Sequence, residues 1–285
     1  MLAAASLIEK EFEVWPGVLR LAAAGEGARD ALDAGMEMAR EISLALMADA
    51  ELLACGSTDI LPRGSAGRLA IEAFHIMRDA LPVDDLPPAL AALPGAVCDA
   101  VLAAMREGGR TTLVLVSVGD VMAVHLEAGE NVPLRTSLPP VLHEFSAALG
   151  AGLQGGVAIG GIRSATPTSG LADCVAVQAR NTALAGLVAA ALADAADVAG
   201  AAREAGHSRD RLVAMGWDGR GVTAVAGLIE PETVWQALSA GVRRASVLRE
   251  KRLLRAAALG LKGRGRTVGP VDGDRLLRFG VSEWR

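Results

Sequence analysis

Aromatic residues are scarce in this chain. Phe, Trp and Tyr make up 3% of its 285 residues, and Tyr is absent altogether. With so few large rings, the core must rest on Ala, Leu and Val, whose small side chains bring helices close to one another and to a sheet. We therefore expect dense packing, and the length suffices for one large domain or two intimate ones.

Cysteine and basic charge are also limited. Cys55, Cys98 and Cys174 lie far apart, without CxxC or Cys/His spacing. This odd set indicates buried thiols in a reducing cytoplasm. The net charge of −5 argues against nucleic acid as a partner, because neutralising phosphates requires a basic face.

The sequence lacks a clean apolar run of membrane-spanning length. Its longest apolar run, residues 182–200, contains Asp194 and Asp197. The N-terminus reaches Glu9, Lys10 and Glu11 too soon for a signal peptide. We therefore expect a cytoplasmic protein with no membrane partner.

Hydrophobic periodicity predicts helices and strands that interleave along the chain. Ser65 is expected to cap a helix, and Gly119-Asp120 to form a hairpin turn or a bulge within 111–126. His125 in the second strand of that hairpin is expected to face outward. Helices are predicted over 26–54, 65–81, 90–106 and from 230 onward, and strands over 6–24, 111–126, 221–228 and 253–268, with residues 137–151 unassigned between a loop and a short helix.

Residues 155–196 form the stretch most suggestive of a site. The pattern is a glycine-rich strand, a loop of small hydroxyl residues, a second strand and a long apolar helix. Small residues beside exposed amides suit a phosphate or carboxylate ligand. The alternatives are an ordinary polar loop and glycines that only relieve crowding against alanine-rich helices. The ligand-binding candidates are Gly119, Asp120, Gly160, Gly161, Arg163, Ser164, Thr166, Thr168 and Ser169, and the candidates for catalysis are Asp120 and Asp173.

Three sequence blocks, in a fixed order, carry a family resemblance. Residues 93–105 read LPGAVCDAVLAAM, residues 116–126 read VSVGDVMAVHL, and residues 160–198 begin GGIRSATPTSGLADCVAV. They resemble the AVAGAVADxVLxxM helix, the NNGGDIALHL strand pair and the GGIATSG…GIADAVTV block of the ApbE-like proteins, relatives of the FAD:protein FMN transferases. The resemblance covers residues 90–269 well and the N-terminal part only in layout.

The resemblance implies an α+β fold, related to the T-fold. We expect a layered antiparallel sheet with long packed helices, as one ApbE-like domain over residues 1–285 or with a subdivision near residues 82–89. Flavin transferases of this superfamily hold Mg²⁺ with an Asp and a Thr in an ADAxxT-type helix. Gly186 and Ala190 stand at those two positions, and neither side chain offers an oxygen ligand. The resemblance therefore argues against Mg²⁺ there.

Three functional hypotheses follow. The first is a flavin-, nucleotide- or pterin-binding enzyme, or a binder derived from one, with its pocket around residues 160–173. The second is a non-catalytic family member that assembles into oligomers, a homodimer being expected, through its alanine-rich helix. The third is a metal-dependent hydrolase using His125 or His143 with Glu144, although no spacing brings these residues together.

Overall fold

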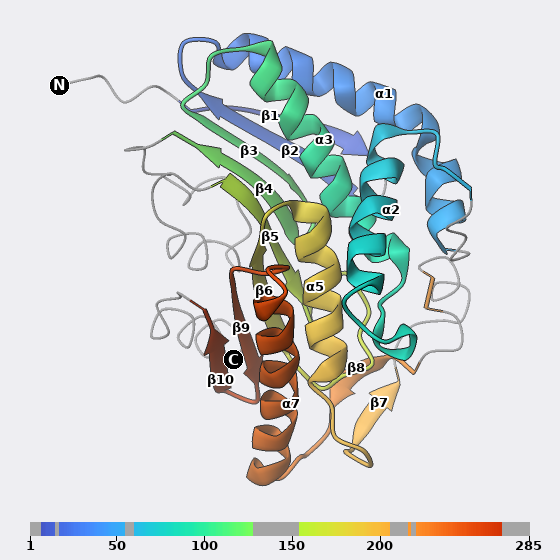
Figure 1. The fold of residues 1–285 in the computed structure, drawn as a ribbon. Helices are drawn as coiled ribbons and strands as arrows, with labels where there is room; N and C mark the ends of the chain where they lie inside the picture. Colours follow the sequence, from blue (N-terminus) through green and yellow to red (C-terminus); the bar gives the residue numbers. More distant parts are fainter. Residues whose placement is uncertain are drawn as a thin grey trace, which may run out of the picture.

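The computed structural model describes residues 7–14, 17–54, 60–127, 154–205, 216–217 and 221–269. The main element of the fold is an eight-stranded sheet in which every neighbouring pair of strands is antiparallel (Figure 1). In spatial order its strands are β1 (Ile8–Val14), β2 (Gly17–Ala24), β3 (Leu113–Val118), β4 (Val121–Leu126), β5 (Gln154–Gly160), β6 (Cys174–Ala179), β9 (Ala256–Leu261) and β10 (Arg264–Val268). A separate pair consists of β7 (Arg203–Ala205) and β8 (Thr223–Ala226).

The helices lie together on one face of the large sheet (Figure 1). They are α1 (Ala28–Ala54), α2 (Ser65–Arg78), α3 (Leu93–Gly108), α5 (Thr182–Ala195) and α7 (Pro231–Glu250), with short 3-10 helices η1 (Val83–Asp85) and η2 (Ala89–Ala92) before α3. This arrangement confirms the predicted α+β class, the antiparallel sheet and its long packed helices. The unassigned segment 137–151 lies outside the described residues.

Helix α5 is enclosed by the rest of the protein. Every residue from Thr182 to Ala193 is buried, because β5, β6, α2, α3, α7 and η2 all pack against the helix. A helix that is apolar all round belongs in a core. The expected homodimer therefore cannot form through α5.

Glycines in β5 let α5 lie directly on the sheet. A Cβ at Gly156 would overlap the backbone of Thr182, and one at Gly160 would lie 2.7 Å from the carbonyl oxygen of Ala189. Neither position has room for a side chain. Close helix–sheet packing thus accounts for both glycines without any ligand.

Asp99 supplies hydrogen-bond acceptors for the backbone N–H groups at the buried start of α5. Its carboxylate accepts hydrogen bonds from the backbone N–H of Thr182 at 2.9 Å and of Ala183 at 2.8 Å, and Asn181 Oδ1 accepts one from Leu184 N. Three N–H groups that a helix cannot pair internally thus have acceptors. Burial raises the pKa of Asp99, and these N–H donors oppose the rise.

The predicted role of Ser65 is wrong. The N-cap position of α2 is occupied by Gly64, so no side chain caps the helix there. Ser65 is already the first helical residue. Asp49 of α1, only 2% exposed, accepts hydrogen bonds from Arg63 N and Gly64 N, both at 2.8 Å. An acid from a neighbouring helix thus fixes the entry to α2, which local spacing cannot reveal.

The central strands are apolar on both faces. All residues of β3, β4 and β6 are buried, and the face opposite the helices forms a second apolar cluster that includes Met122, Val157 and Ala176. Within the described ranges, Ala89–Gly108 is the one helix apolar and long enough to cross a membrane. It packs against α1, α2 and α5, which is the setting of a core helix.

Substituting Gly156 tests the close packing of α5 on the sheet. Gly156→Ala should lower the free energy of unfolding by about 2–3 kcal/mol, because the new methyl group must displace the backbone of Thr182. Gly221→Ala is the control, since its Cβ would have nothing within 4 Å. Urea denaturation measures both, and equal stability of the two variants would contradict the close packing described here.

Candidate functional site

The segment between β5 and β6, residues 161–173, is called the hydroxyl loop below. Its two ends are tied together, since Ile162 N donates to Ala172 O at 2.9 Å and Ser164 N donates to Gly161 O at 3.0 Å. Gly161 has a φ of 107°, a backbone angle that residues with a side chain rarely adopt. A Cβ added at this position would lie 2.8 Å from Asp173 O. The loop is therefore a closed, hydrogen-bonded turn.

Asp120 attaches the tip of this loop to the sheet. It follows Gly119, which has a φ of 55°, in the β3–β4 turn. Its Oδ2 accepts a hydrogen bond from Ala165 N at 2.6 Å, and its backbone oxygen accepts one from Ile159 N at 2.9 Å. Burial raises the pKa of Asp120, while the N–H of Ala165 lowers it.

Asp194, at the end of α5, holds the second half of the loop. Its Oδ1 accepts hydrogen bonds from Thr168 Oγ1 and Ser169 N, both at 2.8 Å. Thr168 Oγ1 in turn accepts one from Gly170 N at 3.0 Å. The hydroxyl of Thr168 is thus engaged within the protein, as is that of Ser164, which donates to Thr166 O at 2.8 Å.

Strands β7 and β8 bind the same half of the loop from outside. Arg203 Nη1 donates to Ser169 O at 2.7 Å, and its Nη2 donates to Asp197 Oδ1 at 2.6 Å. Thr223 donates from N to Thr168 O at 2.8 Å and from Oγ1 to Ser169 O at 3.1 Å. This small sheet therefore rests on the hydroxyl loop.

Asp173 connects the end of the loop to the β9–β10 turn. Its Oδ2 accepts a hydrogen bond from Lys262 N at 2.6 Å. Lys262 has a φ of 47°, unusual for a residue with a side chain, and its Nζ donates to Ala226 O of β8 at 2.8 Å. Three carboxylates, from Asp120, Asp173 and Asp194, thus hold one loop and its neighbours in place.

The predicted site residues fall into two groups. Asp120, Asp173 and Arg163 lie around the buried Cys174, whose thiol pKa is raised by burial and then by both carboxylates, while Arg163 lowers it. Thr168 and Ser169 instead lie beside Asp194. Arg163 is exposed, and Ser164 and Thr166 are half-exposed at the outer edge of the loop. The ligand-binding and catalytic roles assigned from the sequence remain predictions.

Mg²⁺ does not fit at the two positions that the resemblance singled out. A Cβ at Gly186 would lie 2.9 Å from the carbonyl oxygen of Ala91 in η2. Ala190 is 1% exposed within the helical core. Both positions on α5 are helix contacts without side-chain oxygens. Elsewhere in the described part of the chain, no group of three or more His, Cys, Asp and Glu is placed to hold a metal.

The outward orientation predicted for His125 is wrong. This residue is 9% exposed and shares the helix-side face of β4 with Val121 and Ala123, and its Nδ1 has no partner. Burial lowers its pKa, with Arg106 adding to the effect and Glu127 opposing it. His143 and Glu144 lie outside the described residues.

Sequence reasoning assigned no role to Asp99 or to Asp194. Asp99 is an acid among alanines, which is a usable signal. Asp194 enters the sequence analysis only as an interruption of an apolar run. Its actual partners, Thr168 and Ser169, lie 26 and 25 residues away in the chain, and only the tertiary fold brings them together.

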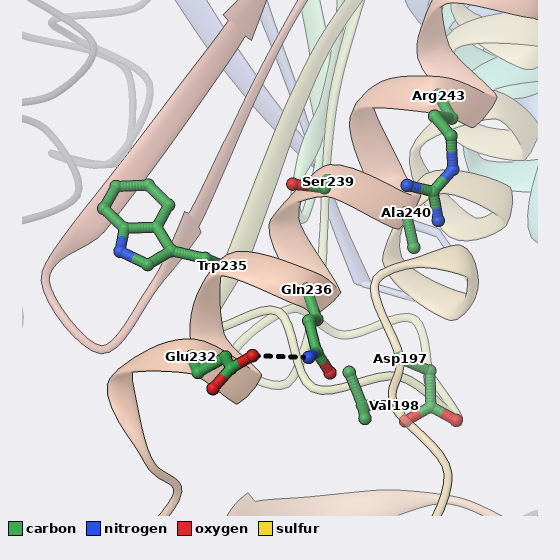
Figure 2. Close-up of a pocket in the computed structure, with 8 residues that line it drawn as sticks. All are labelled: Asp197, Val198, Glu232, Trp235, Gln236, Ser239, Ala240 and Arg243. Carbon is green, nitrogen blue, oxygen red and sulfur yellow. Dashed lines mark hydrogen bonds between the residues drawn. The ribbon is translucent and has the colours of Figure 1, made fainter.

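An open groove of about 700 Å³ runs along α7 (Figure 2). One wall is the N-terminal half of α7, and the other is the segment after α5. The residues that line it are Asp197, Val198, Glu232, Trp235, Gln236, Ser239, Ala240 and Arg243.

Known proteins resemble this chain over most of its length. The family model described as "AbpE bacteria" matches residues 14–267. The apo form of the flavinyl transferase ApbE of Pseudomonas stutzeri is 12% identical, covering 97% of this chain and 99% of its own, with a TM-score of 0.45. A mutant of the flavin transferase ApbE from Vibrio cholerae is 10% identical, covering 96% and 100%, with a TM-score of 0.44. No curated protein matches the chain.

The raised pKa of Asp120 predicts a pH dependence of stability. The folded protein keeps this proton at pH values where the unfolded chain, with the ordinary pKa of 3.8, has lost it. The wild type should therefore lose stability relative to Asp120→Asn as the pH rises from 3.8 through the folded-state pKa, and the difference should then stay constant. Urea denaturation at a series of pH values measures it.

Asp33 supplies the control of opposite sign. Its hydrogen bond with Lys10 is the main cause that lowers its pKa in the folded state. The wild type should lose stability relative to Asp33→Asn as the pH falls, rather than as it rises. A stability difference for Asp120→Asn that is flat, or that follows the same sign as Asp33→Asn, would refute the assignment.

Restoring an acid at position 186 tests the missing metal site. Gly186→Asp should lower the free energy of unfolding by about 3 kcal/mol or more, because it buries a carboxylate against the carbonyl of Ala91. Gly221→Asp, in open space, should change it little. Thermal unfolding with and without Mg²⁺ gives both values, and a Mg²⁺-dependent stabilisation of Gly186→Asp would show that the position is still a metal site.

Proposed function

Because the chain belongs to the AbpE bacteria family, which confirms its ApbE-like resemblance, we propose that it is a cytoplasmic protein that binds a flavin or a related nucleotide without a metal ion at the family position. The ligand class comes from the family, whose relatives include flavin transferases. The carrying observation is the hydroxyl loop, which three carboxylates hold in one conformation. A loop fixed before binding loses little conformational entropy when a ligand arrives.

The outer edge of the loop is where the ligand is proposed to bind. Arg163 is exposed there, and a guanidinium group suits the phosphate of FMN or the pyrophosphate of FAD. The half-exposed Thr166 offers a hydroxyl at the same edge. Thr168 and Ser164 act indirectly, because their hydroxyls already bond to Asp194 and to Thr166 O.

Asp120 is proposed to position the loop. Its carboxylate accepts the N–H of Ala165, two residues beyond Arg163, so it orders the backbone that carries the guanidinium group. Asp173 does the same at the other end through Lys262 N. Neither residue is assigned to a chemical step.

The metal-assisted transfer of the superfamily is not part of this proposal. Its two ligand positions are occupied by Gly186 and Ala190, and the space beside Gly186 belongs to the backbone of η2. We therefore derive no step through Mg²⁺. A binding function without metal is supported by the strand, loop and strand arrangement, which this chain retains.

A homodimer remains part of the proposal, but through a different surface from α5. Leu44 is 90% and Met47 is 55% exposed, and at three residues apart they share one face of α1. We propose that this pair belongs to the contact between two copies, because a contiguous exposed apolar patch marks a protein contact. The molar mass in solution, from light scattering, decides between one and two copies.

Ligand binding is tested by thermal shift. Covalent flavin transfer is tested by mass spectrometry of a peptide that is offered as the acceptor. FMN, FAD and ATP are added in turn to the purified protein, with Mg²⁺ or with EDTA. We expect FMN or FAD to raise the melting temperature equally in both buffers, and no flavin to appear on the peptide. Arg163→Gln should weaken binding about tenfold, whereas Arg29→Gln, an exposed arginine on α1, should leave it unchanged.

Two outcomes would overturn the proposal. If none of the three compounds shifts the melting temperature, the hydroxyl loop is a structural element only. If the shift or a covalent flavin transfer depends on Mg²⁺, the family chemistry survives with other ligands.

A further inference from the structure

The groove along α7 lies on a part of the surface that the proposed function does not use. Figure 2 shows Gln236, Ala240 and Arg243 directed toward the side of α7 on which Asp197 and Val198 lie, and Trp235 on the other side of the helix. Its volume of about 700 Å³ is that of a small-molecule site.

Arg243 is the one positively charged residue among those that line this groove. It is exposed, and its side chain has no hydrogen bond or ion pair within the described part of the chain. The next residue, Arg244, shows the contrast, because its Nη2 lies 2.7 Å from Asp85 Oδ2. The cation in the groove is therefore available to a ligand, while its neighbour is held by the protein.

The two acids of the groove leave room for a negative ligand at the Arg243 end. Asp197 is paired with Arg203 at 2.6 Å, which neutralises its charge. Glu232 lies eleven residues before Arg243, or about 16 Å along the helix axis, and its Oε1 accepts a hydrogen bond from Gln236. Repulsion from Glu232 is therefore remote, and the positive charge dominates near Arg243.

Side chains beside Arg243 complete the site. Ser239 is half-exposed, and its hydroxyl points toward the Trp235 side of α7, away from the guanidinium group (Figure 2). Ala240 and Val198 give an apolar surface between the two walls. Trp235 is engaged elsewhere, because Arg266 lies 4.2 Å and Arg264 lies 5.8 Å from its ring centre.

We propose that this groove binds a small organic oxyanion, a carboxylate or a phosphate monoester, whose charged group contacts Arg243 while its apolar body lies on Ala240 and Val198. A guanidinium group offers several N–H donors, and both kinds of oxyanion accept them. None of the residues that line the groove belongs to the hydroxyl loop, so this proposal is tested independently of the flavin proposal.

Titration with benzoate, phenyl phosphate and inorganic phosphate tests the site. Binding is followed by the chemical shifts of the backbone amides of Ser239, Ala240 and Arg243 in the full-length protein. We expect saturable shifts with benzoate or phenyl phosphate, weaker ones with inorganic phosphate, and a loss of affinity as salt is added. The identity of the stronger organic probe distinguishes a carboxylate site from a phosphate site.

Two arginine variants separate the site from a general charge effect. Arg243→Gln should weaken binding about tenfold, and Arg249→Gln, an exposed arginine on the same helix outside the groove, should leave it unchanged. The proposal is wrong if neither organic probe saturates, or if the two variants weaken binding equally. A folded Arg243→Gln is verified by its melting temperature, and Arg243→Lys should recover part of the affinity.

Discussion

The enclosure of α5 is the constraint on which the rest of this structure depends. A helix of small apolar residues can be buried on all sides only if its neighbours come close and its unpaired N–H groups find acceptors. Gly156 and Gly160 meet the first condition by leaving space on the sheet. Asp99 and Asn181 meet the second by accepting hydrogen bonds at its start.

The same enclosure decides what the candidate site can contain. Gly186 and Ala190 serve helix packing, and a carboxylate at position 186 would meet the backbone of η2. Asp194, one turn beyond Ala190, instead receives the hydroxyl loop through Thr168 and Ser169. The end of α5 thus orders a loop by hydrogen bonding, where the superfamily pattern would place a metal ion nearby.

Sequence patterns predicted the fold well and the contacts poorly. The helices, the β3–β4 hairpin and the order of the strand, loop, strand and helix around α5 follow from periodicity, which local sequence encodes. The cap at Ser65 and the outward His125 were wrong, because Asp49 and the helices packed on β4 lie far away in the chain. Asp120 and Asp173 were predicted as site residues, but their hydrogen-bond partners and the role of Asp194 were not, since hydrogen bonds across 25 to 89 residues leave no spacing signal.

The proposed function combines two features: a loop held by hydrogen bonds, which we propose binds a ligand, and a helix whose family metal positions carry no oxygen ligand. Isothermal titration calorimetry of FMN into the protein, at millimolar Mg²⁺ and again in EDTA, tests metal-independent ligand binding most directly. We expect one binding event per chain with the same dissociation constant in both buffers. An affinity that appears only with Mg²⁺ would contradict the account, and so would the absence of heat from binding in both.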